Sequence, residues 1–107
     1  MRVHVSHFRD RQTVASILDQ PLKVLFAEAV NGLEIADERR VWTDFTMAFS
    51  FIGRVGFISV PVSGEMEVAQ EAVIVTVELP PVVRMLVGED KVRAGLQKEI
   101  LALITRP

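Results

Sequence analysis

The residues best suited to acid–base or metal chemistry are few in this chain of 107 residues, which has two histidines and no cysteine. His4 and His7 lie three positions apart in a segment whose alternating apolar and polar residues predict a strand over residues 3–7. Residues three apart on a strand point to opposite faces, so this pair suits a zinc site poorly. We therefore expect both histidines at the surface, with a helix-capping role open to His7, and no metal site.

Serine and carboxylate patterns also predict no catalytic centre. A catalytic triad could use Ser50, Ser59 or Ser63 as its nucleophile. These serines lie in predicted strands, and none has a glycine-flanked elbow or a histidine close to it in the sequence. The carboxylate pairs, Glu65 with Glu67 and Glu89 with Asp90, are typical of a solvated strand end and a helix start. These patterns predict a protein that is not an enzyme and that has no catalytic residues and no cofactor.

Composition indicates a single domain, residues 1–107, with more apolar residues than is usual. A chain of this length suits one hydrophobic core. The net charge is -2 and the pI is near 5.6, with the two signs interspersed, which argues against a nucleic-acid partner. Half of the residues are hydrophobic and the mean hydropathy is +0.32. A small domain cannot bury everything apolar, so part of this excess is expected at the surface.

The most apolar stretch, Phe45–Gly64, is long enough to span a bilayer but carries Arg54 at its midpoint. A charge there would cost roughly 2.5–3.5 kcal/mol on insertion scales. Two strands joined by a glycine-flanked turn at Gly53–Gly56 explain the same residues better. The N-terminus has no apolar signal-peptide region, so we expect a cytoplasmic protein without a membrane span.

Hydrophobic periodicity predicts the element order β-α-β-β-β-α. An apolar stripe from Val14 to Ala29 indicates a helix capped by Asp10 or Thr13 and interrupted at Pro21. A charged connector, residues 37–40, is predicted to be a solvated turn. Alternating residues then predict three strands, over residues 41–52, 57–68 and 73–79, and a last helix follows over residues 89–104.

These elements predict an α+β fold in which an antiparallel meander is covered on one face by helices. Gly95, in the middle of the last helix, is expected to weaken it by about 1 kcal/mol relative to alanine. Pro61 is unexpected, because a proline in a central strand removes a ladder hydrogen bond.

The sheet face opposite the core carries little charge, which is predicted to be confined to Asp44, Glu65, Glu67 and Glu78, towards the strand ends. Solvent-facing sheets usually carry many charges that discourage pairing, so this face is either a moderately polar open surface or a contact surface. A second copy in a two-fold dimer is the simplest partner. The candidate contact residues are Trp42, Thr46, Ala48, Ser50, Ile52, Phe57, Ser59, Ile74 and Thr76.

A second candidate surface is the apolar segment Leu79–Val87. The ordinary structure for such a short run is a buried connector helix. The alternative is an amphipathic element that docks on a lipid, polyester or partner surface with its one arginine at the rim. Its candidate docking residues are Val82, Val83, Arg84, Met85 and Leu86.

Several segments match a pattern found in one bacterial family. They are His7 ahead of the first helix, the strand opening Trp42–Phe45, the segments Val62–Val68 and Val73–Pro80, and a final helix spaced Val92, Leu96, Ile100 and Leu103. In these features the chain resembles the polyhydroxyalkanoic acid system proteins, a family linked to polyester-granule genes. The resemblance implies an intracellular bacterial accessory protein associated with polyhydroxyalkanoate granules, and it carries over no catalytic residue.

Taken together, these observations predict a non-enzymatic interaction protein that forms a homodimer and contacts a hydrophobic granule surface or granule proteins. The alternative is a small binding protein for fatty acyl or hydroxyacyl groups held between the sheet and the helices. The residues expected to line that pocket are Phe45, Met47, Phe49 and Phe51. A cavity of a few hundred Å³ would favour the alternative.

Overall fold

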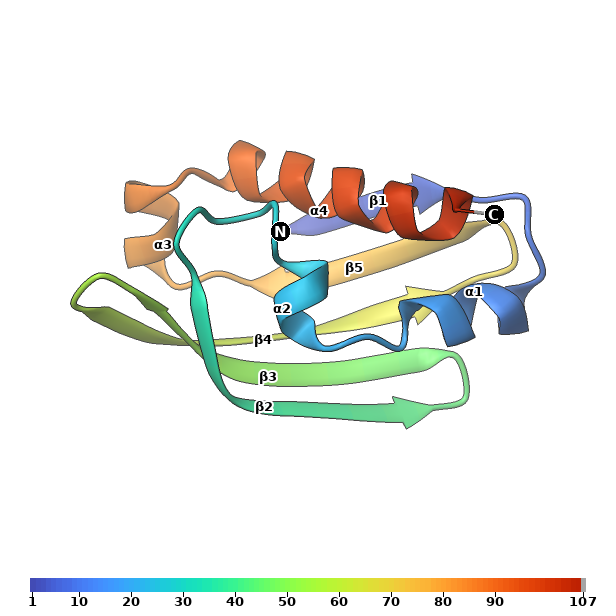
Figure 1. Ribbon diagram of the computed structural model, residues 1–107, viewed down its shortest axis with the longest axis horizontal. Helices are drawn as coiled ribbons and strands as arrows, with labels where there is room; N and C mark the ends of the chain where they lie inside the picture. Colours follow the sequence, from blue (N-terminus) through green and yellow to red (C-terminus); the bar gives the residue numbers. More distant parts are fainter. Residues whose placement is uncertain (107) are drawn as a thin grey trace.

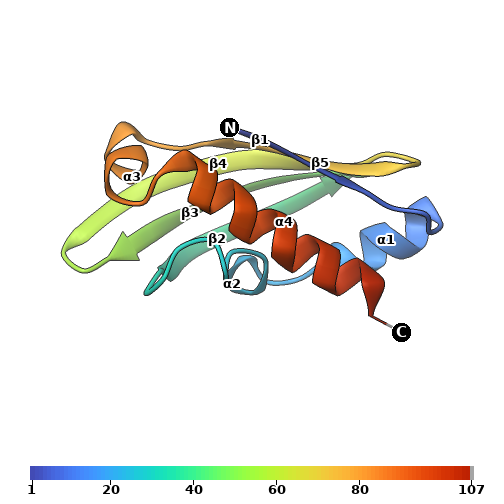
Figure 2. The same ribbon diagram turned by 90° about the horizontal axis from the view of Figure 1, so that it is seen from above.

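The computed structural model describes residues 1–106 and contains a five-stranded antiparallel sheet in the order β1-β5-β4-β3-β2 (Figure 1). Helices α1, α2 and α4 lie on one face of this sheet (Figure 2). The elements are β1 (Arg2–Ser6), α1 (Arg11–Leu18), α2 (Leu22–Leu25), β2 (Glu34–Thr43), β3 (Thr46–Val55), β4 (Ile58–Val68), β5 (Ala72–Glu78), α3 (Pro81–Leu86) and α4 (Glu89–Thr105). The predicted α+β fold, with its antiparallel meander, is confirmed.

The first helical region is divided as the sequence predicts. Asp10 caps α1, because its carboxylate accepts a hydrogen bond from the backbone N–H of Thr13 at 3.1 Å. Pro21 then separates α1 from α2 and is the N-cap residue of α2. A proline cannot donate the hydrogen bond that a continuous helix would need there, so the apolar stripe is carried by two short helices.

Gly95 lets α4 approach the chain that follows α2. A Cβ atom at this position would lie 2.5 Å from Ala29 Cα and 2.6 Å from the carbonyl carbon of Glu28. Real Cβ atoms essentially never lie so close to backbone atoms. The glycine that weakens the helix locally is therefore required by its packing.

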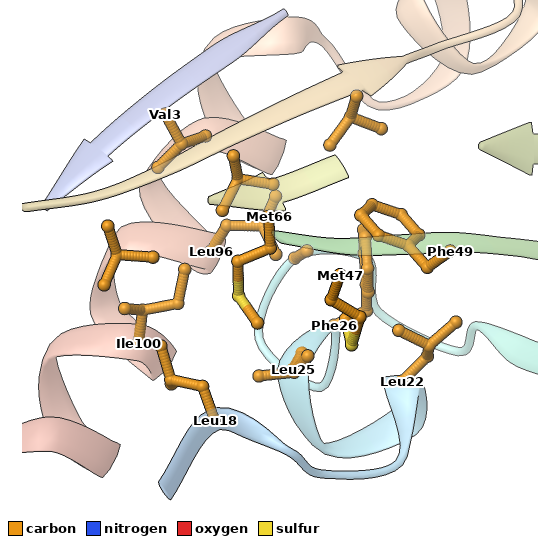
Figure 3. Packing of buried hydrophobic residues seen from close by; sticks show 14 of the residues in the cluster. Val3, Leu18, Leu22, Leu25, Phe26, Met47, Phe49, Met66, Leu96 and Ile100 are labelled. Atoms are coloured by element: carbon orange, nitrogen blue, oxygen red, sulfur yellow. The ribbon is translucent and has the colours of Figure 1, made fainter. Parts of the chain in front are cut away.

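The core lies between the sheet and the helices, where side chains from α1, α2, α4 and the strands meet in one layer (Figure 3). Phe26 packs edge-on against Phe51 and Phe49, with ring centroids 5.1 Å and 5.8 Å away. The largest fully buried side chains are Leu18, Leu22, Met47, Met66, Leu96 and Ile100.

The structure corrects the sequence prediction around β2. Residues 37–40, predicted to be a solvated turn, belong to a strand that starts at Glu34, and the predicted strand 41–52 is two strands joined by a turn at Asp44–Phe45. Asp44 takes the left-handed backbone conformation that this turn needs, with φ of 55°. Because β2 is an edge strand with one neighbour, its charged side chains reach water without leaving the sheet.

The second hairpin explains both the glycine-flanked stretch and Pro61. The β3–β4 turn lies at Gly56–Phe57, slightly later than predicted, with Gly56 at φ of 61°. Strand β5 pairs with β4 only from Ser63 to Val68, whereas β3 pairs with β4 along almost its whole length. Pro61 thus lies where β4 has a single neighbour, a position that suits proline. Among residues 1–106, no helix has the length and apolar character needed to cross a bilayer.

Candidate functional site

The two histidines have different environments, and the prediction that both lie at the surface is wrong for His7. Its side chain is only 4% exposed. Nε2 donates to the carbonyl oxygen of Ala69 at 2.9 Å, and Nδ1 accepts from the backbone N–H of Arg9 at 3.3 Å. His7 therefore links the β1–α1 loop to the β4–β5 turn and has no free ring nitrogen for a substrate, whereas His4 is exposed on β1.

The sheet face opposite the helices, here called the open sheet face, brings together most of the predicted contact residues. Cross-strand pairing joins Ala48 to Glu65 and Glu65 to Thr76, so side chains from β3, β4 and β5 form rows across this face. Its predicted members are Thr46, Ala48, Ser50, Ile52, Ser59, Ile74 and Thr76.

Two predicted contact residues lie elsewhere. Trp42 is opposite Met47 in the β2–β3 pair, so it faces the helices, and its Nε1 donates to Asp19 Oδ1 at 3.0 Å. The prediction placed it on the open sheet face because it missed the turn at Asp44–Phe45, which reverses the alternation. Val41 takes the corresponding outward position, opposite Ala48. Phe57 is at the tip of the β3–β4 turn.

The open sheet face also carries more charge than the sequence predicted. Arg39 of β2 lies opposite Ser50, and Arg2 of β1 lies opposite Thr76. Arg39 lies on this face because residues 37–40 belong to β2, whereas the sequence predicts a connector there. An open depression of about 560 Å³ occupies the middle of the face, with small residues in its lining and Arg39, Glu65 and Glu78 beside them.

Residues Pro81–Leu86 of the predicted segment form α3, and none of them is buried, so the buried-connector interpretation is wrong for this helix. Leu79, which precedes it, is buried. Met85 and Leu86 are 85% and 60% exposed, while Val82 and Val83 are half-buried. Arg84 folds back on its own segment, because Nε and Nη2 both donate to the carbonyl oxygen of Leu79 at 3.2 Å. Arg84 is still exposed, so the surface of α3 presents this arginine beside Met85 and Leu86.

An apolar cleft separates α3 from the β3–β4 hairpin, and both project at the same end of the molecule (Figure 1). Its volume is about 50 Å³, and the residues that line it are all apolar or glycine, including Phe51, Val55, Val60, Val83 and Leu86. At its outer side Phe57 is 107% exposed and Ile58 is 36% exposed. We call Phe57, Ile58, Met85 and Leu86 the apolar end.

Of the residues expected to line an acyl pocket, only Phe51 borders this cleft. Met47 and Phe49 adjoin a space of about 10 Å³, which is about the size of one water probe. Phe45 lies under the guanidinium of Arg11, 3.9 Å from its ring centroid. The interior next to Met47 and Phe49 is thus close-packed.

The chain matches no protein-family model, no curated protein and no solved structure. The open sheet face and the apolar end are therefore the features that indicate its function.

Proposed function

We propose that this protein is a non-enzymatic bacterial accessory protein that attaches to a hydrophobic surface through its apolar end. The observation that carries the proposal is an apolar cleft between α3 and the β3–β4 hairpin, lined at its edges by Ile58 and Leu86, with Phe57 and Met85 exposed next to them in the chain. Single exposed apolar residues are common, but an apolar cleft flanked by several exposed apolar residues indicates a contact surface. Burying a large apolar side chain contributes about 1.5–3 kcal/mol, so two or three of them suffice for reversible attachment.

The surface we propose is that of a polyhydroxyalkanoate storage granule in the cytoplasm. The segments that resemble the granule-associated family, Val62–Val68 and Val73–Pro80, include the paired parts of β4 and β5 and lead directly into α3. A polyester surface is apolar and extended, so the protein does not need a deep pocket to bind it. Exposed apolar side chains beside a cleft of only about 50 Å³ suit such a surface.

Self-association through the open sheet face is a second part of the proposal. No helix among residues 1–106 covers this face, and apolar or small side chains such as Val41, Ile52 and Ile74 lie on it. A homodimer would present two apolar ends, which strengthens attachment to an extended surface by avidity.

Attachment is tested by replacing Phe57 with aspartate and measuring cosedimentation with polyhydroxybutyrate granules. Phe8→Asp is the matched control, because Phe8 is 101% exposed and belongs to the β1–α1 loop at the other end of the molecule (Figure 1). We expect Phe57→Asp to weaken binding about tenfold, which corresponds to roughly 1.4 kcal/mol, and Phe8→Asp to bind like the wild type. Equal binding by the two variants, or no binding by the wild type, would overturn the proposal.

A fatty acyl or hydroxyacyl ligand is the second candidate, favoured by the position of α3 over the apolar cleft. None of the residues of α3 is fully buried, and an outward displacement of α3 would enlarge the space beside Phe51. Titration calorimetry with a medium-chain hydroxy acid tests this function. Saturable one-to-one binding that is lost in Val83→Asp supports it, and the absence of heat at millimolar ligand excludes it.

A further inference from the structure

One row of side chains on the open sheet face ends in opposite charges. Cross-strand pairing places Glu78 of β5 opposite Ser63 of β4, Ser63 opposite Ser50 of β3, and Ser50 opposite Arg39 of β2. Glu78 and Arg39 are exposed, and neither forms an ion pair within the part of the chain that the structure describes. The row therefore reads acid, serine, serine, base from one side of the face to the other.

We propose that a second copy covers this face, related by a two-fold axis that runs parallel to the strands between β3 and β4. This inference rests on the self-association proposed above and specifies its geometry. Such an axis lays β3 of one copy on β4 of the other and β2 on β5. Ser50 then faces Ser63, and Arg39 of each copy faces Glu78 of the other, so the dimer contains two identical ion pairs.

The charges select this axis over the other face-to-face arrangement. A two-fold axis along the row itself would place Arg39 against Arg39 and Glu78 against Glu78, and like charges facing each other are unfavourable. With the strand-parallel axis the neighbouring rows also avoid like charges. Glu65 faces Ala48 and Thr76 faces Val41, as follows from their pairing within one sheet.

The area of the open sheet face and the lengths of the charged side chains are compatible with this dimer. Stacked sheets lie about 10 Å apart, a gap that an arginine and a glutamate extending towards each other can bridge. Four strands about 4.8 Å apart share three rows about 6.7 Å apart, and β3 and β4 share two more rows, which gives a face of roughly 500 Å² per copy. The total of about 1,000 Å² is near the lower limit for a stable interface, so we expect a reversible dimer. The depression beside Ser50 and Ser63 lies at the axis, and the oppositely charged side chains close its rim.

The test exchanges the charges and follows the oligomeric state by sedimentation velocity in the micromolar range. Alone, Glu78→Arg places arginine against Arg39 at both pairs, and Arg39→Glu places glutamate against Glu78. Each variant is expected to raise the dimer Kd at least about tenfold. An equimolar mixture of the two is expected to form a heterodimer with an affinity close to wild type, because each pair again joins opposite charges. Arg54→Glu is the control, since Arg54 is on the same face but faces Ser59 in this geometry.

The outcomes separate the inference from the function on which it rests. Single variants that dimerise like the wild type, or a mixture that stays monomeric, would refute the strand-parallel pairing while leaving self-association in place. A wild type that stays monomeric at all concentrations would overturn self-association itself and this inference with it. The granule assay with Phe57→Asp measures attachment to the granule independently of self-association and of the strand-parallel pairing. High salt should also weaken the wild-type dimer, because it screens exposed ion pairs.

Discussion

Replacing Gly95 with alanine should destabilise the protein, although helix propensity alone predicts the opposite. Alanine is favoured over glycine by about 1 kcal/mol inside a helix. The added methyl group, however, would lie 2.5 Å from Ala29 Cα and 2.6 Å from the carbonyl carbon of Glu28, and it would also contact the Glu28 carbonyl oxygen. These are backbone atoms, so the contact cannot be relieved by turning a side chain.

The size of the effect follows from these two opposing terms. Overpacking a close-packed site typically costs about 1–3 kcal/mol, and contact with three backbone atoms suggests the upper part of that range. After the gain in helix propensity of about 1 kcal/mol is subtracted, we expect a net loss of roughly 1–2 kcal/mol. For a domain of this size such a loss lowers the unfolding temperature by about 5–10 °C.

Urea denaturation measures this loss, and Ala94→Gly is the control. Ala94 precedes Gly95 in α4 and is exposed, so this change removes only helix propensity and should also destabilise, by about 1 kcal/mol. If propensity alone governed α4, the two variants would change stability in opposite directions. A Gly95→Ala protein as stable as the wild type, or more stable, would refute the close approach of α4 to residues 28–29.

Two further predictions concern hydrogen bonds that hold loops and helix ends. His7→Ala should lower the free energy of unfolding by about 1–3 kcal/mol, measured by thermal unfolding, because it leaves the carbonyl of Ala69 without its buried donor. His4→Ala is the control and should change this free energy by less than about 0.5 kcal/mol. Equal effects of the two variants would contradict the linking role of His7. Asp10→Ala should cost about 1 kcal/mol through loss of the cap on α1. Asp10→Asn should retain most of that stability, and a loss as large as for alanine would show that the bond to the Thr13 amide is not its cause.

The fold could be predicted where local pattern and tertiary packing agree. Pro21 divides the first helical region in any context, because the proline ring and the missing amide hydrogen act locally. The apolar faces of β3, β4 and β5 were predictable because they alternate against one buried layer. The first part of β2, residues 34–40, could not be found in this way, since an edge strand with charged residues such as Asp37 and Arg40 has no apolar alternation to reveal it.

The candidate surfaces, too, could be predicted only in part from the sequence. The open sheet face was predicted from residues such as Ala48 and Thr76, but one missed turn placed Trp42 on the wrong side, since a shift of one residue exchanges the two faces of a strand. Arg39 is missed because the sequence predicts a connector over residues 37–40, which belong to β2. The exposure of α3 could not be predicted, because a short apolar run has the same sequence whether it is covered or not.

Local sequence patterns predict the classes of element, the division at Pro21, the apolar face of the meander and an excess of apolar residues. These are properties of neighbouring residues and of their periodicity. Where that excess lies depends on tertiary packing: Ile58 and Leu86 line one cleft although they belong to distant parts of the chain. Tertiary packing also decided the charge pattern of the open sheet face, because Glu78 and Arg39 share a row through the pairing of four strands. Such juxtapositions depend on strand order and register, which are set by long-range packing.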